Sequence, residues 1–312
     1  MDATQISNVV IAGAGTMGAS IAQVYAEHGF SAVLWNRSEE GIDRAKTLIE
    51  ANQAALVASG RLTREDSRSL LGRISYERTE DCFSDAEFVI ESIVEDLAKK
   101  QEFYRHISPL LPEDGILVTN TSGLSVTALA SAVSLPARFC GMHWINPPHL
   151  IPLVEVIQGE QTAAETVDAV FELALRAGKK PIRVKDVPGF ILNRLQFAVM
   201  REALSLAESG AAELSDIDGA MKYGLGLRWA CLGPFETADI GGLDIFARVA
   251  EYLFPDLSDR KDVPELLRSL YEQGAWGVKS GRGFYDYSGD KAAAAVKNRD
   301  EKFIRVIDSL KP

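Results

Sequence analysis

The stretch NVVIAGAGTMGASIAQVYAEHG, residues 8–29, contains the pattern that decides the fold of this 312-residue chain. A short β-branched run leads into a GxGxxG turn at residues 13–18, and an apolar helical pattern follows it. In such a turn the first glycine makes the bend, the second lets a pyrophosphate approach the backbone, and the third packs the helix on the strand. A second strand follows within about 20 residues, so a dinucleotide site is predicted. Its expected contacts are Gly13, Gly15, Thr16, Met17 and Gly18.

Short β-branched runs and longer helical patterns alternate through the first half of the chain. SAVLWN (31–36), FVIES (88–92) and GILVTN (115–120) are such runs. This rhythm predicts an α/β fold with a Rossmann-like, doubly wound parallel sheet over residues 1–185. After the sequence DVPG, which begins at Asp186, helical patterns dominate. Residues 186–312 are therefore predicted to form an all-helical C-terminal domain.

The overall charge limits the classes of partner. The net charge is -11 and the pI is near 5.0, so the surface repels phosphate backbones and anionic membranes. No run approaches the roughly 18 apolar residues that a membrane span needs. The sequence therefore predicts no nucleic-acid partner and no membrane partner, and it favours a small-molecule substrate.

Cysteine usage and the N-terminal sequence bear on location. Cys82, Cys140 and Cys231 are widely spaced, fit no metal-binding pattern and do not make an even disulfide set. We expect free thiols, no metal site and a reducing cytoplasm. The first residues, MDATQISNVVIAGAG, contain no basic n-region, so no signal peptide is expected.

The end of the second predicted strand bears on the type of dinucleotide. An NAD site usually has Asp or Glu here to bind the ribose hydroxyls, whereas this chain has Asn36. Asparagine can bind a hydroxyl without repelling a 2′-phosphate, and Arg37 with Ser38 could bind one. Arg37 could equally be a solvated surface charge. The residues alone leave NAD and NADP both open.

A lone carboxylate lies within the apolar end of GMHWINPPHLIPLVEVI, residues 141–157. Glu155 is flanked by Leu153, Val154, Val156 and Ile157. A buried, unpaired carboxylate costs several kcal/mol, so it needs a partner. The nearest candidates along the chain are His143 and His149.

Eight motifs occur in order along the chain: GAGTMG (13–18), ESIVEDLAKK (91–100), NTSGLS (120–125), HWINPP (143–148), LVEV (153–156), DVPGFILNRL (186–195), LGPFETADIGGLD (232–244) and KSGRGFYDY (279–287). Together they resemble the 3-hydroxyacyl-CoA dehydrogenase family, and the resemblance runs nearly end to end. It implies NAD as cofactor and hydride transfer between a substrate CH–OH and the nicotinamide, with the protein positioning and polarising the reactants.

The resemblance also implies roles for individual residues. The family's catalytic base falls on His143 and its orienting carboxylate on Glu155. Ser122 and Asn193 fall on the hydrogen-bond donors to the reacting oxygen. By the resemblance, Glu95 and Lys100 lie on the nicotinamide-ribose side of the cofactor, and Asn146 supports the site from its turn. The other expected cofactor contacts are Asn36, Arg37 and Asn120.

Each polar residue has a structural alternative. Ser122 could cap a helix beginning near Leu124, and Asn193 could lie on the polar face of a helix. Asn146 before a proline is often only a turn former. His149 is more typical of a rim residue that contacts substrate or solvent.

Two departures from the family concern coenzyme A. Family members that bind it have lysines in the helical hairpin after the second strand, but residues 49–66 contain only Arg61 and Arg64 as basic residues. Ile151-Pro152 before LVEV resembles relatives that act on small free hydroxy acids or alcohols. Trp144 is expected either to narrow an acyl cavity or to lie in the core. A small substrate without coenzyme A is slightly favoured, and a short-chain hydroxyacyl-CoA is the alternative.

Two further hypotheses concern catalysis and assembly. A chain that binds dinucleotide without catalysis is the rival from another class, and the retained polar residues argue against it. The apolar stripe of the C-terminal helices predicts a homodimer formed through this domain, although packing against the first domain would explain one stripe equally well. The stripe comprises Leu195, Val199, Ala203 and Leu206.

Overall fold

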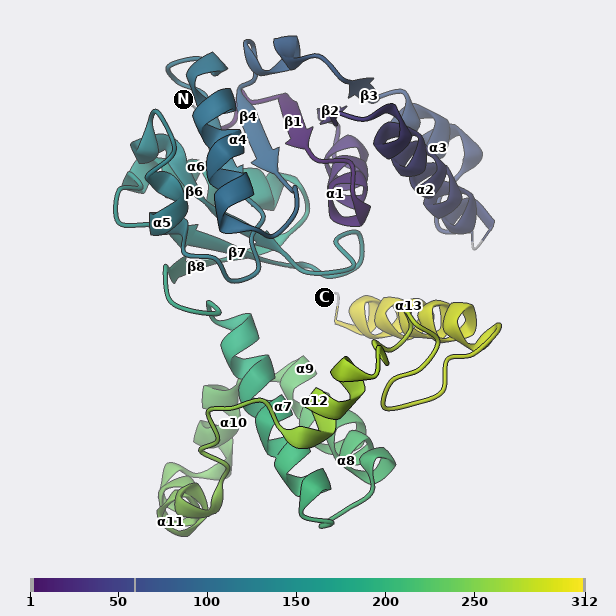
Figure 1. Cartoon of the computed structure of the whole chain (residues 1–312), viewed down its shortest axis with the longest axis vertical. Coiled ribbons are helices and arrows are strands. Elements are labelled where there is room, and N and C mark those ends of the chain that lie inside the picture. Colours follow the sequence, from purple (N-terminus) through teal and green to yellow (C-terminus); the bar gives the residue numbers. More distant parts are fainter. Residues whose placement is uncertain (1–2, 59, 311–312) are drawn as a thin grey trace. The chain divides into compact units, whose positions relative to one another are not determined.

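The computed structural model describes residues 3–58 and 60–310. The chain divides between Arg194 and Leu195 into two compact units (Figure 1). The first unit is built on a sheet and the second is helical, as the sequence predicted. None of the described helices is both long enough and apolar enough to cross a membrane.

The first unit contains an eight-stranded sheet in the order β3-β2-β1-β4-β5-β6-β7-β8. Strands β1 to β6 are parallel, β7 is antiparallel to β6, and β8 is parallel to β7. The chain passes from β1 outward to β3 and then returns to β4 on the other side of β1. This reversal is the switch point at which doubly wound sheets bind ligands. The strand bounds are β1 Asn8–Ala12, β2 Ser31–Trp35, β3 Ile74–Glu77, β4 Phe88–Glu91, β5 Ile116–Thr119, β6 Phe139–Trp144, β7 Leu153–Gln158 and β8 Lys180–Lys185.

Helices cover both faces of the sheet. One face packs on α1 (Thr16–Glu27) and α6 (Ala164–Arg176), and the other packs on α4 (Leu97–Ile107) and α5 (Val126–Ala130). Because side chains alternate between the faces of a strand, neighbouring residues join different cores. The hairpin formed by α2 (Glu39–Ala58) and α3 (Arg64–Leu71) precedes the edge strand β3.

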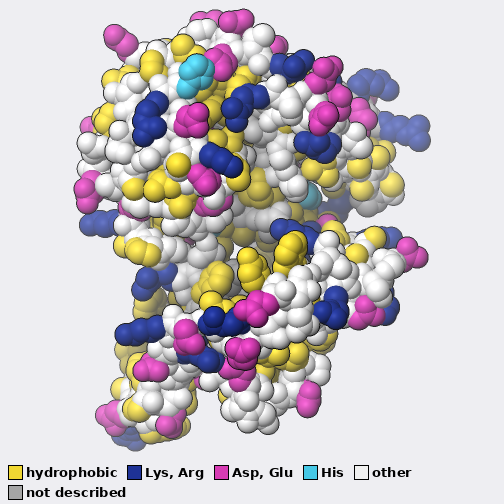
Figure 2. Space-filling view, viewed as in Figure 1, with side chains coloured by type: hydrophobic (Ala, Val, Ile, Leu, Met, Phe, Trp, Pro, Cys, Tyr) yellow, Lys and Arg dark blue, Asp and Glu magenta, His cyan; other side chains and the backbone are white. Residues whose placement is uncertain are grey.

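The described part of the second unit is mainly helical, with two isolated β-bridges, from Arg282 to Gly277 and to Asp286. It contains most of α7 (Leu192–Glu208), followed by α8 (Leu214–Ala220), a π-helical turn at Met221–Leu225, α9 (Gly226–Cys231), α10 (Pro234–Gly241), α11 (Leu243–Leu253), α12 (Glu265–Glu272) and α13 (Lys291–Ser309). Among its described residues the buried apolar side chains are Leu204, Pro264 and Ala275. Large apolar side chains such as Phe235 and Ile240 remain exposed, and Figure 2 shows apolar atoms spread over this unit.

The predicted fold class is confirmed, with two elements that the sequence analysis did not anticipate. The strand β3 has four residues, and only Ile74 is buried in it, so its apolar pattern is weak. The helix α13 lies in an alanine-rich, charged stretch without a buried residue. Residues 74–77 alternate apolar and polar side chains over only four positions, and all the apolar side chains of α13 are at least partly exposed, so neither stretch stands out in the sequence as a buried element.

Candidate active site

The glycine-rich turn connects β1 to α1 beside the switch point. Gly13 has φ +119°, and a Cβ on it would lie 2.5 Å from the carbonyl oxygen of Ser92, directly after β4. A Cβ on Gly18 would lie 1.8 Å from the Gly13 oxygen. Around Gly15, by contrast, no atom lies within 4 Å of the Cβ position. The outer glycines are therefore required by the packing, while Gly15 leaves room for a phosphate at the N-terminus of α1.

Asn36 follows β2 and contacts this turn. Its Oδ1 accepts a hydrogen bond from the amide of Ala14 at 3.5 Å. Its Nδ2 donates to the carbonyl oxygen and to Oγ of Ser38, at 3.0 and 3.1 Å. Arg37 and Ser38 are exposed. Asn36 thus joins the end of β2 to the phosphate turn, at the position expected to face the ribose.

His143 and Glu155 form the centre of the site. They lie directly opposite each other on β6 and β7, and Nδ1 of His143 is 2.7 Å from Oε2 of Glu155. The histidine is 5% exposed and the glutamate is fully buried. Because a carboxylate can only accept, the proton of this bond belongs to Nδ1, and in the neutral ring the lone pair lies on Nε2. The pair therefore has the arrangement that a general base requires.

The other carboxylate oxygen of Glu155 is held by the backbone. Oε1 accepts hydrogen bonds from the amides of Ile191 and Leu192, each at 2.9 Å, at the start of α7. Burial alone would raise the pKa of Glu155, but the hydrogen bonds from His143 and from these two amides outweigh it and lower the pKa below its ordinary value. Glu155 therefore stays ionised beside the histidine.

Phe190 forms one wall of the histidine site, and the sequence analysis did not single it out. Its ring centroid lies 5.8 Å from that of His143, and its side chain is 1% exposed. Its φ of 51° is unusual for a residue with a side chain, and it follows Gly189 with φ 76°. Strained backbone is frequent at functional sites. The signal in the sequence was a bulky residue directly after the glycine of DVPGF.

Ser122 and Asn193 come together from segments far apart in the chain. Nδ2 of Asn193 donates to the carbonyl oxygen of Ser122 at 2.7 Å. Ser122 is exposed, and the N-cap of α5 is Ser125, whose side chain accepts from the amide of Ala128. Ser122 is thus not the helix cap. Its hydroxyl remains available for the expected role at the reacting oxygen.

A buried ionic cluster lies beneath the Ser122 loop. Lys100 and Glu91 are fully buried and form an ion pair at 2.6 Å. Tyr104 and Thr119 donate hydrogen bonds to the other oxygen of Glu91. Lys100 also lies 3.5 Å from Glu95.

Glu95 links this cluster to the loop after β5. Its Oε1 accepts hydrogen bonds from the hydroxyl of Thr121 at 2.5 Å and from the amide of Ser122 at 2.8 Å. The side chain of Glu95 is 42% exposed, whereas that of Lys100 is fully buried. Of these two predicted cofactor residues, Glu95 is therefore the one accessible to a ligand. Lys100 contacts Glu95 from the buried side.

The remaining predicted residues lie after β5 and β6. Asn120 is buried; its Oδ1 accepts from the amide of Trp144 at 3.0 Å and its Nδ2 donates to Ser92 at 3.2 Å. Asn120 thereby links the ends of the neighbouring strands β4, β5 and β6. Asn146 is exposed on the turn after β6 and is followed by a cis peptide bond to Pro147. His149 lies half-buried on the same turn, while the partner of Glu155 is His143.

Trp144 lies in the core. It is 2% exposed and belongs to the cluster formed with α1 and α6. His143, as its neighbour in an extended strand, points to the opposite face. The expectation that Trp144 narrows an acyl cavity is therefore wrong, and the core alternative is right.

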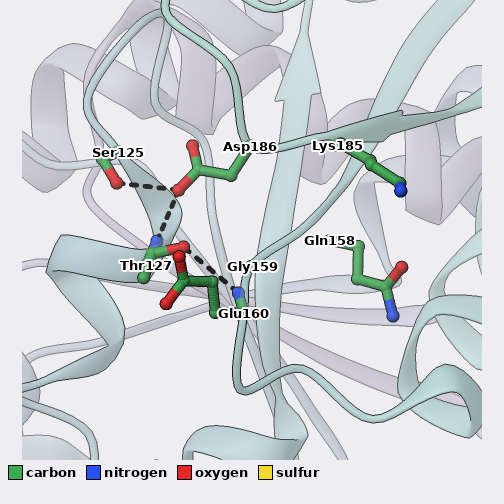
Figure 3. Close-up of a pocket in the computed structure, with 7 residues that line it drawn as sticks. All are labelled: Ser125, Thr127, Gln158, Gly159, Glu160, Lys185 and Asp186. Carbon is green, nitrogen blue, oxygen red and sulfur yellow. Dashed lines mark hydrogen bonds between the residues drawn. The ribbon is translucent and has the colours of Figure 1, made fainter.

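A separate polar hollow of about 460 Å³ is drawn in Figure 3. Asp186 accepts hydrogen bonds there from the hydroxyl of Ser125 at 2.7 Å and from the amide of Thr127 at 2.8 Å. Burial would raise the pKa of Asp186, but these hydrogen bonds lower it. None of the predicted site residues lines the hollow; its lining is Ser125, Thr127, Gln158, Gly159, Glu160, Lys185 and Asp186. The aspartate of DVPGF thus anchors the start of α5.

Within the described part of the chain, no group of three acidic, histidine or cysteine side chains could hold a metal ion.

Both parts of the chain match models of one protein family. Residues 8–187 match the NAD binding domain of 3-hydroxyacyl-CoA dehydrogenase, and residues 189–287 match its C-terminal domain.

Individual relatives cover almost the whole chain. The 5-formyl-3-hydroxy-2-methylpyridine 4-carboxylate 5-dehydrogenase of Mesorhizobium japonicum is 36% identical over 303 residues, which cover 96% of this chain and 97% of that one. A probable 3-hydroxybutyryl-CoA dehydrogenase of Deinococcus radiodurans is 41% identical over 278 residues, which cover 89% of this chain and 99% of that one. A crystal structure of a 5-formyl-3-hydroxy-2-methylpyridine 4-carboxylic acid 5-dehydrogenase, described as an NAD+-dependent dismutase, superposes with a TM-score of 0.90 at 35% identity, covering 99% of this chain and 100% of that one.

Proposed function

This chain belongs to the 3-hydroxyacyl-CoA dehydrogenase family, and from that premise we propose that it interconverts a CH–OH group and a carbonyl on a small carboxylate that is not attached to coenzyme A. The observation that carries the catalytic part is the buried His143–Glu155 pair, with Nδ1 of the histidine 2.7 Å from the carboxylate. A purely dinucleotide-binding protein has no use for such a pair.

The cofactor is NAD, as the match of residues 8–187 to the family's NAD binding domain indicates. The chain fits it, because the open space at Gly15 admits a pyrophosphate where a side chain would block it. When bound, NAD+ supplies the hydride acceptor for the reaction. In our proposal, the contacts of its ribose and nicotinamide side are Asn36, Arg37, Glu95, Asn120 and Asn146, with Lys100 behind Glu95.

Side chains of the protein accept the proton of the substrate hydroxyl and stabilise the resulting charges. In alcohol oxidation Nε2 of His143 accepts the hydroxyl proton, and Glu155 stabilises the imidazolium charge through Nδ1. The two amides of α7 keep Glu155 ionised and in place. Ser122 and Asn193, which are joined by a hydrogen bond, donate to the reacting oxygen, where negative charge develops.

Two observations favour a substrate without coenzyme A. Residues 49–66 of the hairpin of α2 and α3 contain no lysine, and their only basic residues are Arg61 and Arg64, so few cations are offered to the phosphates of coenzyme A. The second is the likeness to the pyridine carboxylate dehydrogenase structure, which covers 99% of the chain at a TM-score of 0.90.

A short-chain 3-hydroxyacyl-CoA is the second candidate. It is favoured by the 41% identity to the probable 3-hydroxybutyryl-CoA dehydrogenase. The two candidate substrates differ in whether the protein must bind a phosphate-bearing carrier. Activity assays with each substrate distinguish the two candidates directly.

The test is NADH oxidation with acetoacetyl-CoA, with small free keto acids and with a pyridine carbaldehyde acid. Preference for a free acid supports the proposal, and preference for the thioester supports the second candidate. His143→Gln should lower turnover by about a hundredfold or more with NADH binding intact. His106→Gln is the matched control, because His106 is an exposed histidine paired with Glu80 at 2.8 Å. No turnover of any substrate, alongside micromolar NADH binding, would support the non-catalytic rival.

We also propose a homodimer formed through the C-terminal helices and a cytoplasmic location. The exposed apolar side chains of this unit, including Phe235 at 85% and Tyr223 at 83%, support the dimer. The free thiols of Cys82, Cys140 and Cys231 are consistent with a reducing compartment. Residues 1–185 would then bind the cofactor, and residues 186–312 would contribute to substrate binding and dimerisation. Light scattering that gives a monomer mass would contradict the dimer.

A further inference from the structure

Lys179 is a buried cation that none of the steps above uses. It lies between α6 and β8 and is 7% exposed. Its Nζ donates hydrogen bonds to the carbonyl oxygens of Pro148 and Ile151, the latter at 3.1 Å. Both acceptors belong to the turn 145–152, which connects the strand of His143 to the strand of Glu155. One ammonium group therefore binds two points of a single turn.

The burial of Lys179 is costly because it is not offset by an ion pair. Within the described residues no carboxylate lies at ion-pair distance from Nζ, and the charge of Glu27 acts only from further away. Burial lowers the pKa of Lys179 to about 8, and Glu27 opposes the shift. The compensating interactions are the two carbonyl groups and the ring of Trp144, whose centroid lies 5.3 Å from Nζ.

The turn needs a donor from outside itself. Pro147 and Pro148 have no amide hydrogen, and the amides of Leu150 and Ile151 both donate to Pro147, each at 3.0 Å. The carbonyl groups of residues 148 and 151 are thus satisfied by the lysine. Because Trp144 packs on the α1 and α6 face, Lys179 holds the turn from the face opposite His143.

We propose that Lys179 is a positioning residue for the reaction: through the carbonyl groups of Pro148 and Ile151 it fixes residues 148–151 of the turn, which present His149 to the substrate. This inference rests on the proposed function, because it assumes that the turn borders the substrate. Lys179 itself touches neither substrate nor cofactor. Its loss should therefore impair substrate use while NADH binding stays unchanged.

The experiment compares Lys179→Met with Lys180→Met. The methionine keeps the packing of the stem on Trp144 and removes the donors. Lys180 is an exposed neighbour whose ammonium group, within the described residues, makes no hydrogen bond or ion pair, and its backbone bond to Pro152 is unaffected by the substitution. Hydrogen exchange of the peptide that contains Leu150 and Ile151 should become about tenfold faster or more in Lys179→Met alone, as expected for the loss of a charge-assisted hydrogen bond. The ratio kcat/KM for the substrate should fall by about tenfold, mainly through KM, with the Kd for NADH within about twofold.

Lys179→Gln serves where Lys179→Met does not fold, because its neutral amide can still donate to one carbonyl group. It should give intermediate exchange and an intermediate KM. A folded variant with wild-type exchange and wild-type KM overturns the proposal. So does faster exchange without a change in kcat/KM, or a Kd for NADH that rises in step with KM. If the wild type converts no substrate, the proposed function fails, whereas the exchange measurement still shows whether Lys179 holds the turn.

Discussion

Replacing Glu155 by Gln changes the hydrogen-bonding state of His143 while keeping the size of the side chain. The amide oxygen can still accept from the amides of Ile191 and Leu192, which hold one end of the side chain. The amide nitrogen then faces Nδ1 of His143 and donates to it, so the ring proton moves to Nε2. The nitrogen that should accept the hydroxyl proton is then blocked. We expect kcat to fall by about 10² to 10⁴-fold with little change in NADH binding.

The same substitution has a predicted effect on stability. The carboxylate accepts three hydrogen bonds, and a bond to a charged group contributes about 1 kcal/mol more than a neutral one, so Glu155→Gln should cost about 3 kcal/mol in unfolding free energy at pH 7. Because the folded pKa of Glu155 lies below its ordinary value of 4.5, this stabilisation is fully present above pH 4.5 and is lost as pH falls through the folded pKa. The stability gap between wild type and variant should therefore close on the acid side.

Turnover measured by NADH absorbance and urea unfolding at several pH values test both effects. Glu160→Gln is the matched control, because Glu160 is an exposed glutamate just beyond the same strand β7. If Glu155→Gln keeps kcat within about threefold of the wild type, Glu155 does not set the state of the histidine, and the reasoning fails.

Three further predictions concern other parts of the first unit. Lys100→Met leaves Glu91 buried without its counter-ion and should cost about 3–5 kcal/mol in unfolding free energy. Lys99 is an exposed neighbour, so Lys99→Met should cost little. Equal urea midpoints for the two variants would refute this prediction. Gly18→Ala places a Cβ 1.8 Å from a carbonyl oxygen and should weaken NADH binding by about tenfold or more, as fluorescence titration would show. Asn36→Asp adds a charge that repels a 2′-phosphate, so the preference for NAD+ over NADP+ should rise by about tenfold; an unchanged ratio of kcat/KM values would mean that residue 36 does not face the ribose.

The sequence predicted the features that depend on local patterns. The glycine turn, the strand rhythm and the helical second half follow from periodicity and from glycine geometry, and the structure has them. The partner of Glu155 could be narrowed to two histidines from the cost of burying a charge. The face on which Trp144 lies was also predictable, because a residue next to His143 in a strand must point the other way.

The sequence could not predict contacts that are made by residues far apart in the chain or by backbone groups. The amides of Ile191 and Leu192 that bind Glu155 have no side-chain signature, since every residue except proline carries such a donor. The positive φ of Phe190 depends on the fold around it. Glu91 reads as the end of a buried strand, and only the packing of α4 on β4 shows that it is a carboxylate bound by Lys100.

The antiparallel direction of β7 relative to β6 places the two residues of the catalytic pair opposite each other. In the antiparallel pairing of β6 and β7, His143 lies opposite Glu155, while Met142 lies opposite Val156 on the other face of the sheet. A slip of one residue would move Glu155 into the apolar core and place Val154 or Val156 opposite His143. The turn 145–152 determines this register, because it sets how many residues separate the two strands. Lys179 binds this turn at two carbonyl groups, so it holds the connection between the strand of the base and the strand of its carboxylate.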